Sequence, residues 1–167
     1  MALDPTLSFT APGMSDTGSV ITGESSGSFG YAQVAGDFNA DGKIDLAVGS
    51  SGYSSAAGRV YVFYNDGSYH ALAVGADVMI TGDALSQFGY ALTAGDFNAD
   101  GRTDLAVGAY AHPVSGTTTG RAYVFFSDGS YPALASSADV VITGEGQYNS
   151  FGSALEVGDI NKDGKED

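Results

Sequence analysis

The sequence predicts an all-β protein made of repeated four-stranded antiparallel units, and three observations support that fold class. One motif recurs three times along the chain, and the segments between its copies also repeat. The chain holds 25 glycines among 167 residues, which suits many short strands joined by tight turns. The segment RVYVFY (59–64) places apolar side chains on both of its faces, so its sheet is expected to be covered on both sides.

The repeat begins at a Phe-Gly pair. Such pairs start at Phe29, Phe88 and Phe151, which gives periods of 59 and 63 residues. The first two copies open as FGYAQVAGDFNADGKIDLAVG and FGYALTAGDFNADGRTDLAVG, and the third reads FGSALEVGDINKDGKED. We divide the chain into an N-terminal segment (1–28), a first repeat (29–87), a second repeat (88–150) and the truncated start of a third repeat (151–167).

Each complete repeat is predicted to contain four short strands, the first two of which flank an acidic loop. The predicted ranges are 30–36, 45–50, 59–64 and 77–82 in the first repeat, and 89–95, 104–109, 121–126 and 139–144 in the second. An isolated copy of the fourth strand precedes the first repeat at 18–23. Residues 6–10 are the candidate for a third strand beside it.

A sheet that is apolar on both faces must pack against a neighbour on each side. A linear solenoid or a closed propeller meets this need, and the propeller suits the long period better because solenoid rungs are shorter. Two complete units cannot close a ring, since propellers need roughly 4–8 blades. We therefore expect either a fragment of a longer propeller or a homo-oligomer of stacked copies. The open blade faces are expected to expose Tyr61, Phe63, Tyr123 and Phe125.

The charge of the chain is strongly acidic, with a net value of −14. Such a surface repels phosphate, so nucleic acid is excluded as a partner. No run of about 18 apolar residues is present, so no membrane insertion is expected. The chain has no cysteine, which removes disulfides and thiolate metal sites. Nine of the 20 carboxylates are concentrated in three loops, where packed negative charge calls for a cation.

These loops share the pattern D-x-N-x-D-G-x-x-D, which predicts a calcium site. The alternating side chains direct hard oxygen atoms to one point, the glycine permits a turn with positive φ, and the carbonyl of the seventh residue can face the ion. The predicted ligands are Asp37, Asn39, Asp41, the Lys43 carbonyl and Asp45; Asp96, Asn98, Asp100, the Arg102 carbonyl and Asp104; and Asp159, Asn161, Asp163, the Lys165 carbonyl and Asp167. We expect two to three Ca²⁺ ions.

The composition of the loops argues against other metals and against an EF-hand. Histidine and cysteine are absent from the loops, so zinc and copper are poor candidates. The twelfth position is Val48 or Val107 rather than glutamate, which excludes an EF-hand. Asp, Asn and Gly also form solvated turns, although three copies in register argue against that interpretation. It stays open whether the ions carry a function or serve only as structural staples.

No catalytic constellation is predicted. The G-x-S-x-G pattern around Ser25 lacks the strand–helix context and the His and Asp partners of a nucleophile elbow. His70 aligns with Pro132 and is expected at the surface. His112 lies in the insertion of the second repeat and is expected to be a loop residue. We therefore expect a protein that is not an enzyme.

The Phe-Gly start, the DFNADGKID-type loop and the following LAVG resemble the FG-GAP repeats of integrin alpha subunits and of many bacterial extracellular proteins. The likeness covers residues 18–167, and only the "GAP" part departs, with Gly49-Ser50-Ser51 and Gly108-Ala109-Tyr110 in its place, which points to the bacterial branch. The resemblance implies a β-propeller in which each repeat is one blade and calcium lies between its first two strands.

The same resemblance implies adhesion or ligand recognition outside the cell, where calcium is near millimolar and sites of moderate affinity fill. Whether the ligand is a protein or a glycan is not specified by the sequence. Two alternatives stay open. One is a purely structural or assembly module of a larger surface protein, and the other is an accessory domain of a secreted hydrolase or lyase.

Overall fold

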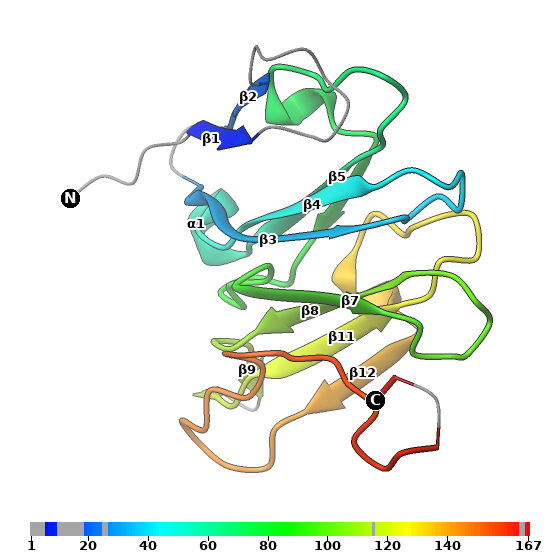
Figure 1. Ribbon diagram of the computed structural model, residues 1–167. Coiled ribbons are helices and arrows are strands. Elements are labelled where there is room, and N and C mark those ends of the chain that lie inside the picture. Colours follow the sequence, from blue (N-terminus) through cyan, green and yellow to red (C-terminus); the bar gives the residue numbers. More distant parts are fainter. Residues whose placement is uncertain (1–5, 10–18, 25–26, 115, 164–165) are drawn as a thin grey trace.

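A computed structural model describes residues 6–9, 19–24, 27–114, 116–163 and 166–167 of the chain. Its main feature is a pair of four-stranded antiparallel sheets, one from each complete repeat, which confirms the all-β class. Figure 1 shows the two sheets stacked face to face, with a two-stranded ribbon on one side of the stack and the segment that follows the second sheet on the other. We call the two sheets blade 1 and blade 2.

Blade 1 has the strand order β3 (Phe29–Gly36), β4 (Asp45–Ser50), β5 (Arg59–Phe63) and β6 (Val78–Thr81). Each strand pairs antiparallel with the next, so β4 and β5 form the middle of the sheet. All of β4 and the last four residues of β5 are buried, as expected for strands that are apolar on both faces.

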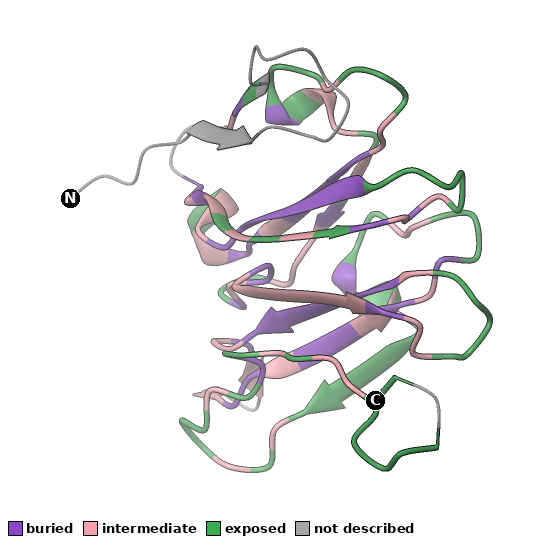
Figure 2. Cartoon of the chain, viewed as in Figure 1, coloured by how far each residue is buried: buried purple, intermediate pink, exposed green. Residues whose placement is uncertain are grey.

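Blade 2 repeats this order with β7 (Ala91–Gly95), β8 (Asp104–Ala109), β11 (Arg121–Phe125) and β12 (Val140–Thr143). Every strand of both blades lies within two residues of its predicted bounds. The two blades differ at their outer strands, because all four residues of β12 are exposed, as the green arrow in Figure 2 shows.

Smaller elements surround the blades. Strand β1 (Thr6–Phe9) pairs antiparallel with β2 (Ser19–Thr22), so the predicted third- and fourth-strand segments at the N-terminus form one ribbon. The insertion of the second repeat forms a hairpin of β9 (Pro113–Val114) and β10 (Thr117–Thr118). A single turn, α1 (Tyr53–Ala56), follows β4. Two 3₁₀ turns, η1 (Ala73–Gly75) and η2 (Ala135–Ser137), precede the fourth strands.

The hydrophobic core lies at the junctions between these layers, and its members are equivalent from one junction to the next. At the ribbon, Ile21 packs with blade 1 in a cluster that also contains Phe29, Val48, Tyr61 and Phe63. The junction between the blades repeats this set with Ile80, Phe88, Val107, Tyr123 and Phe125. The phenylalanine of each of the first two Phe-Gly pairs meets the tyrosine of the third strand of its own repeat edge-on, with ring centroids 5.5 and 5.4 Å apart. The Phe-Gly motif is therefore a packing motif.

The glycine of each Leu-Ala-Val-Gly segment has a separate role. A Cβ atom on Gly49 would overlap the carbonyl oxygen of Gly89, and one on Gly108 would overlap that of Gly152. The backbones of successive repeats thus approach each other where no side chain fits.

One expectation about the edges of the molecule is wrong. Tyr61, Phe63, Tyr123 and Phe125 are at most 1% exposed rather than on open faces. The ribbon covers the first pair and blade 1 covers the second. The exposed large apolar side chains include three consecutive residues of β12, Val140, Val141 and Ile142, and also Phe151. The third Phe-Gly pair does not begin a strand: Phe151 makes one bridge to Gly120, and residues 152–158 have no partner strand among the described residues.

Candidate metal centre

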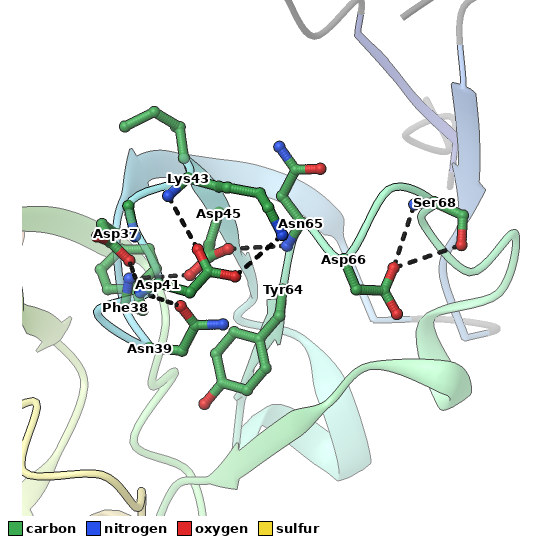
Figure 3. Close-up of polar contacts among 12 residues, drawn as sticks. Asp37, Phe38, Asn39, Asp41, Lys43, Asp45, Tyr64, Asn65, Asp66 and Ser68 are labelled. Carbon is green, nitrogen blue, oxygen red and sulfur yellow. Dashed lines mark hydrogen bonds and ion pairs between the residues drawn. The ribbon is translucent and has the colours of Figure 1, made fainter.

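The first acidic loop, residues 37–45, joins β3 to β4 and is held in shape by its own side chains (Figure 3). The amide nitrogen of Asp41 donates to Asp37 Oδ1 and to Asn39 Oδ1, both at 3.0 Å. The Gly42 amide donates to Asp37 Oδ2 at 2.9 Å, and the Lys43 amide donates to Asp41 Oδ1 at 2.9 Å. The bond from Lys43 lowers the pKa of the Asp41 carboxyl. Three predicted ligands are thus drawn onto one stretch of backbone.

The backbone of this loop passes through the left-handed region twice. Ala40 has φ of 58° and Gly42 has φ of 82°. The left-handed glycine was predicted from the motif, whereas a left-handed alanine was not, because its Cβ crowds the backbone. The side-chain bonds to the amides of Asp41 and Gly42 hold this conformation.

Asp45 closes the loop and anchors it to the blade. It is 1% exposed, and its Oδ2 accepts the Phe38 amide at 2.9 Å while its Oδ1 accepts the Asn65 amide at 2.8 Å. Burial raises the pKa of this carboxyl, partly offset by the two amides. A neighbouring cation would favour the ionised form. Asn65, which follows β5, was not predicted as part of the site.

The second loop, residues 96–104, has the same geometry. The Asp100 amide donates to Asp96 Oδ1 and Asn98 Oδ1, both at 2.9 Å, and the Gly101 amide donates to Asp96 Oδ2 at 2.8 Å. Ala99 and Gly101 have φ of 60° and 85°. Asp104 is fully buried and accepts the amides of Phe97 and Ser127, and burial raises its pKa. The sequence repeat is therefore also a repeat of hydrogen bonds.

The third loop keeps the local part of this arrangement. The Asp163 amide donates to Asp159 Oδ1 at 3.0 Å and to Asn161 Oδ1 at 2.8 Å, and Lys162 has φ of 62°. Asp167 accepts the amides of Ile160 and Asn161 but is exposed. Lys165, whose carbonyl was predicted as a ligand, lies outside the described residues.

The donor set of the loops fits a hard cation. Carboxylate, carboxamide and carbonyl oxygens are the ligands that Ca²⁺ takes, and an oxygen that accepts one N–H bond keeps a further lone pair. Within the described part of the chain, no three His, Cys, Asp or Glu side chains are grouped so that they could hold a metal ion. A calcium site in these loops therefore depends on Asn39 or Asn98 and on backbone carbonyls as well as on the carboxylates.

The remaining singled-out residues lie away from the loops. His70 is exposed, as expected. His112 is a loop residue between β8 and β9, as expected, but it is only 6% exposed, and its Nε2 lies 3.0 Å from Asp83 Oδ2. Ser25 falls outside the described residues. No helix among the described residues is long and apolar enough to cross a membrane.

Comparison with known proteins identifies the repeat. The sequence model of the FG-GAP repeat matches residues 29–63 and 88–125, which run from each Phe-Gly pair to the end of the third strand. The chain is 37% identical over 152 residues to phosphatidylinositol-glycan-specific phospholipase D of Bos taurus, a match that covers 83% of the chain and 18% of that protein. It is 34% identical over 144 residues to integrin alpha-7 of Homo sapiens, which covers 83% of the chain and 11% of the integrin.

A third relative, integrin alpha-IIb of Mus musculus, is 32% identical over 146 residues, which covers 83% of the chain and 13% of that integrin. The chain thus spans less than a fifth of the length of these relatives. The chain therefore contains two copies of the FG-GAP repeat, and each copy lies within one four-stranded blade.

Proposed function

We propose that this chain is a calcium-binding segment that serves adhesion or ligand recognition outside the cell and performs no catalysis. The observation that carries the proposal is the agreement between the loops at 37–45 and 96–104. They share ligand residues, amide bonds and left-handed backbone positions. Solvated turns of unrelated origin have no reason to agree at every one of these points.

The ion would relieve charge repulsion within each loop. Three carboxylates and one Ca²⁺ leave a single negative charge, and the ion would draw on Asp37, Asn39, Asp41 and the Lys43 carbonyl in the first loop. Asp45, the fifth predicted ligand, also accepts a backbone amide on each carboxylate oxygen, so it holds the loop closed as well as adding its charge from a buried position.

The proposed location outside the cell follows from the ion, because loops of moderate affinity fill where calcium is near millimolar. The likeness to integrin alpha subunits supports an adhesive role in the same place. A glycan and protein array probed with the calcium-loaded chain would reveal a ligand, and the same array with chelator would show whether recognition needs the ion.

Calorimetric titration of the metal-free chain tests the calcium proposal. We expect two sites of similar affinity from the first two loops, a weaker third site, and poor substitution by Mg²⁺, which demands a compact octahedral shell. A titration without binding heat, supported by an unchanged thermal melt, would refute calcium binding.

A second candidate is an accessory region of a secreted hydrolase, because relatives with 35–37% identity include phosphatidylinositol-glycan-specific phospholipase D from Bos taurus and Homo sapiens. The catalytic machinery of such a protein would lie outside this chain. A screen for esterase, glycosidase and phosphatase activity should be blank, and activity that disappears in Ser25→Ala would contradict a non-catalytic role.

The exposed apolar side chains of β12 support packing against a further sheet, either from a longer parent chain or from a second copy. Val140, Val141 and Ile142 are 37–48% exposed, whereas Ile80 of blade 1, which is equivalent to Ile142, is fully buried. Light scattering of the chain over a range of concentrations tests self-association, and a strictly monomeric species would exclude the second copy.

A further inference from the structure

Ser127 is a buried residue that contacts two acidic loops at once. It follows β11, is 3% exposed, and forms three hydrogen bonds. Its amide donates to Asp104 Oδ1 at 2.8 Å, and its carbonyl accepts Arg102 Nη1 at 2.9 Å, so its backbone is tied to the second loop. Its hydroxyl Oγ donates at 2.9 Å to the carbonyl of Phe38, which belongs to the first loop.

The contact on the first loop falls between two predicted ligands. Phe38 separates Asp37 from Asn39 and is 1% exposed. Its amide is held by Asp45, and its carbonyl accepts both Ser127 Oγ and, at 3.4 Å, the hydroxyl of Tyr131. The carbonyl of Phe38 and the amide of Asn39 share one planar peptide unit, so fixing that carbonyl also fixes the position of the Asn39 backbone nitrogen.

The second loop reaches Ser127 through its seventh and ninth positions. Arg102 is the residue whose carbonyl is proposed as a ligand, and Asp104 closes the loop. A cation that orders these two residues would also order the Ser127 backbone, from which the hydroxyl points to the first loop. The path is a chain of direct contacts, Arg102 and Asp104 to Ser127 to Phe38, and spans the junction between the blades.

We propose that Ser127 couples the first two loops, so that occupancy of one by Ca²⁺ raises the affinity of the other. This inference rests on the proposed calcium binding. Coupling between two sites is reciprocal by thermodynamic necessity, so each loop must affect the other by the same factor. Ser127 acts as a positioning residue, since its contacts are to the loops and not to the ion.

The test uses one disabling substitution in each loop. Asp100→Ala should lower the calcium affinity of the first loop roughly fivefold, and Asp41→Ala should lower that of the second by the same factor. NMR titration, read at the Gly42 and Gly101 amides, follows each loop separately. In the Ser127→Ala background, which keeps the backbone bonds of residue 127, both factors should fall toward one.

Ser130→Ala is the matched control. Ser130 lies on the same turn, is exposed, and bonds to Asp128 through its backbone amide, which the substitution retains. It should leave the coupling factor unchanged. Tyr131→Phe removes the second, longer contact to Phe38 and should lower the factor by less than Ser127→Ala does.

A metal-free measurement separates the two proposals. Without calcium, Ser127→Ala should speed hydrogen exchange at the Gly42 amide roughly fivefold, because the loop loses a restraint, whereas Ser130→Ala should not. If the loops bind no Ca²⁺, the proposed function fails even where exchange responds. If Ca²⁺ binds with a coupling factor that Ser127→Ala leaves intact, the coupling is overturned and calcium binding stands.

Discussion

The first and third acidic loops carry the same ligand pattern in different surroundings. In both loops, the amide of the fifth residue donates to the side chains of the first Asp and of the Asn. In both, the fourth residue of the loop has a left-handed backbone conformation. Their second residues differ, because Phe38 is 1% exposed and Ile160 is 82% exposed. Their last residues differ too, since the Asp45 carboxylate accepts an amide from a segment beyond β5, whereas the Asp167 carboxylate accepts the amides of Ile160 and Asn161 of its own loop.

This difference separates the part of the loop that nearby residues form from the part that needs the rest of the blade. The turn forms from the short pattern D-x-N-x-D-G, because Asp and Asn side chains bond to amides two to five residues ahead. The anchor at the ninth position needs a folded blade to supply its second amide. The turn shape alone is therefore no measure of how firmly a loop is held.

The largest expected effect comes from breaking the anchor. Asp45→Ala leaves the amide of the buried Phe38 and that of the partly buried Asn65 without an acceptor, and each buried group left so costs about 1–3 kcal/mol. The free energy of unfolding should fall by about 2–5 kcal/mol, as measured by urea denaturation in chelator. Asp167→Ala is the matched control and should cost less than about 1 kcal/mol, since water reaches its partners. Equal losses would show that the anchor does not depend on burial.

Removal of calcium should have the next largest effect. With Ca²⁺ at about a hundred times its dissociation constant, one occupied site adds about 2.7 kcal/mol to the stability of the fold. Thermal melts with calcium and with chelator should differ by several degrees or more. Hydrogen exchange should slow most at the first two loops, and greater protection of the third loop would reverse the proposed order of affinity.

Single ligand substitutions should remove ions one at a time. Asp41→Ala and Asp100→Ala lie at exposed positions, so each should abolish one bound Ca²⁺ and leave the blades folded. Asp163→Ala should change the number of tightly bound ions less, because the third loop lacks a buried anchor. Metal counting on the purified variants checks this, and unchanged stoichiometry in Asp41→Ala would remove that residue from the ligand set.

The smallest expected effect comes from substituting the left-handed fourth residue, and it should be similar in the first and third loops. Ala40→Gly and Lys162→Gly replace a left-handed residue with glycine, which adopts positive φ without strain. Glycine also raises the entropy of the unfolded chain, so the net change in the free energy of unfolding should be less than about 1 kcal/mol. For Ala40→Gly we expect a small gain in the unfolding free energy. For Lys162→Gly we expect hydrogen exchange at the amides of the third loop to slow by a similarly small amount. A loss in either would mean that the methyl or lysine side chain has a packing role.

Much of the fold could be predicted from the sequence. The strand bounds followed from turn residues and from runs such as RVYVF, and the loops followed from their repeated Asp, Asn and Gly positions. The ribbon of β1 and β2 was predictable because its second strand repeats the ITG segment of β6. The hairpin β9–β10 and the burial of His112 were not, because they belong to an insertion without a second copy for comparison.

The local conformations could be predicted from the sequence alone: four strands to a complete repeat, a left-handed glycine in each of the first two acidic loops, and the side-chain oxygens that surround it. These depend on residues within a few positions of one another. The tertiary structure alone decided which aspartates are buried anchors, which apolar face stays open, and that Ser127 lies against Phe38, 89 positions away. Such contacts depend on how one blade packs on the next. Two loops with the same ligand pattern can differ in them, because the partner atoms come from elsewhere in the chain.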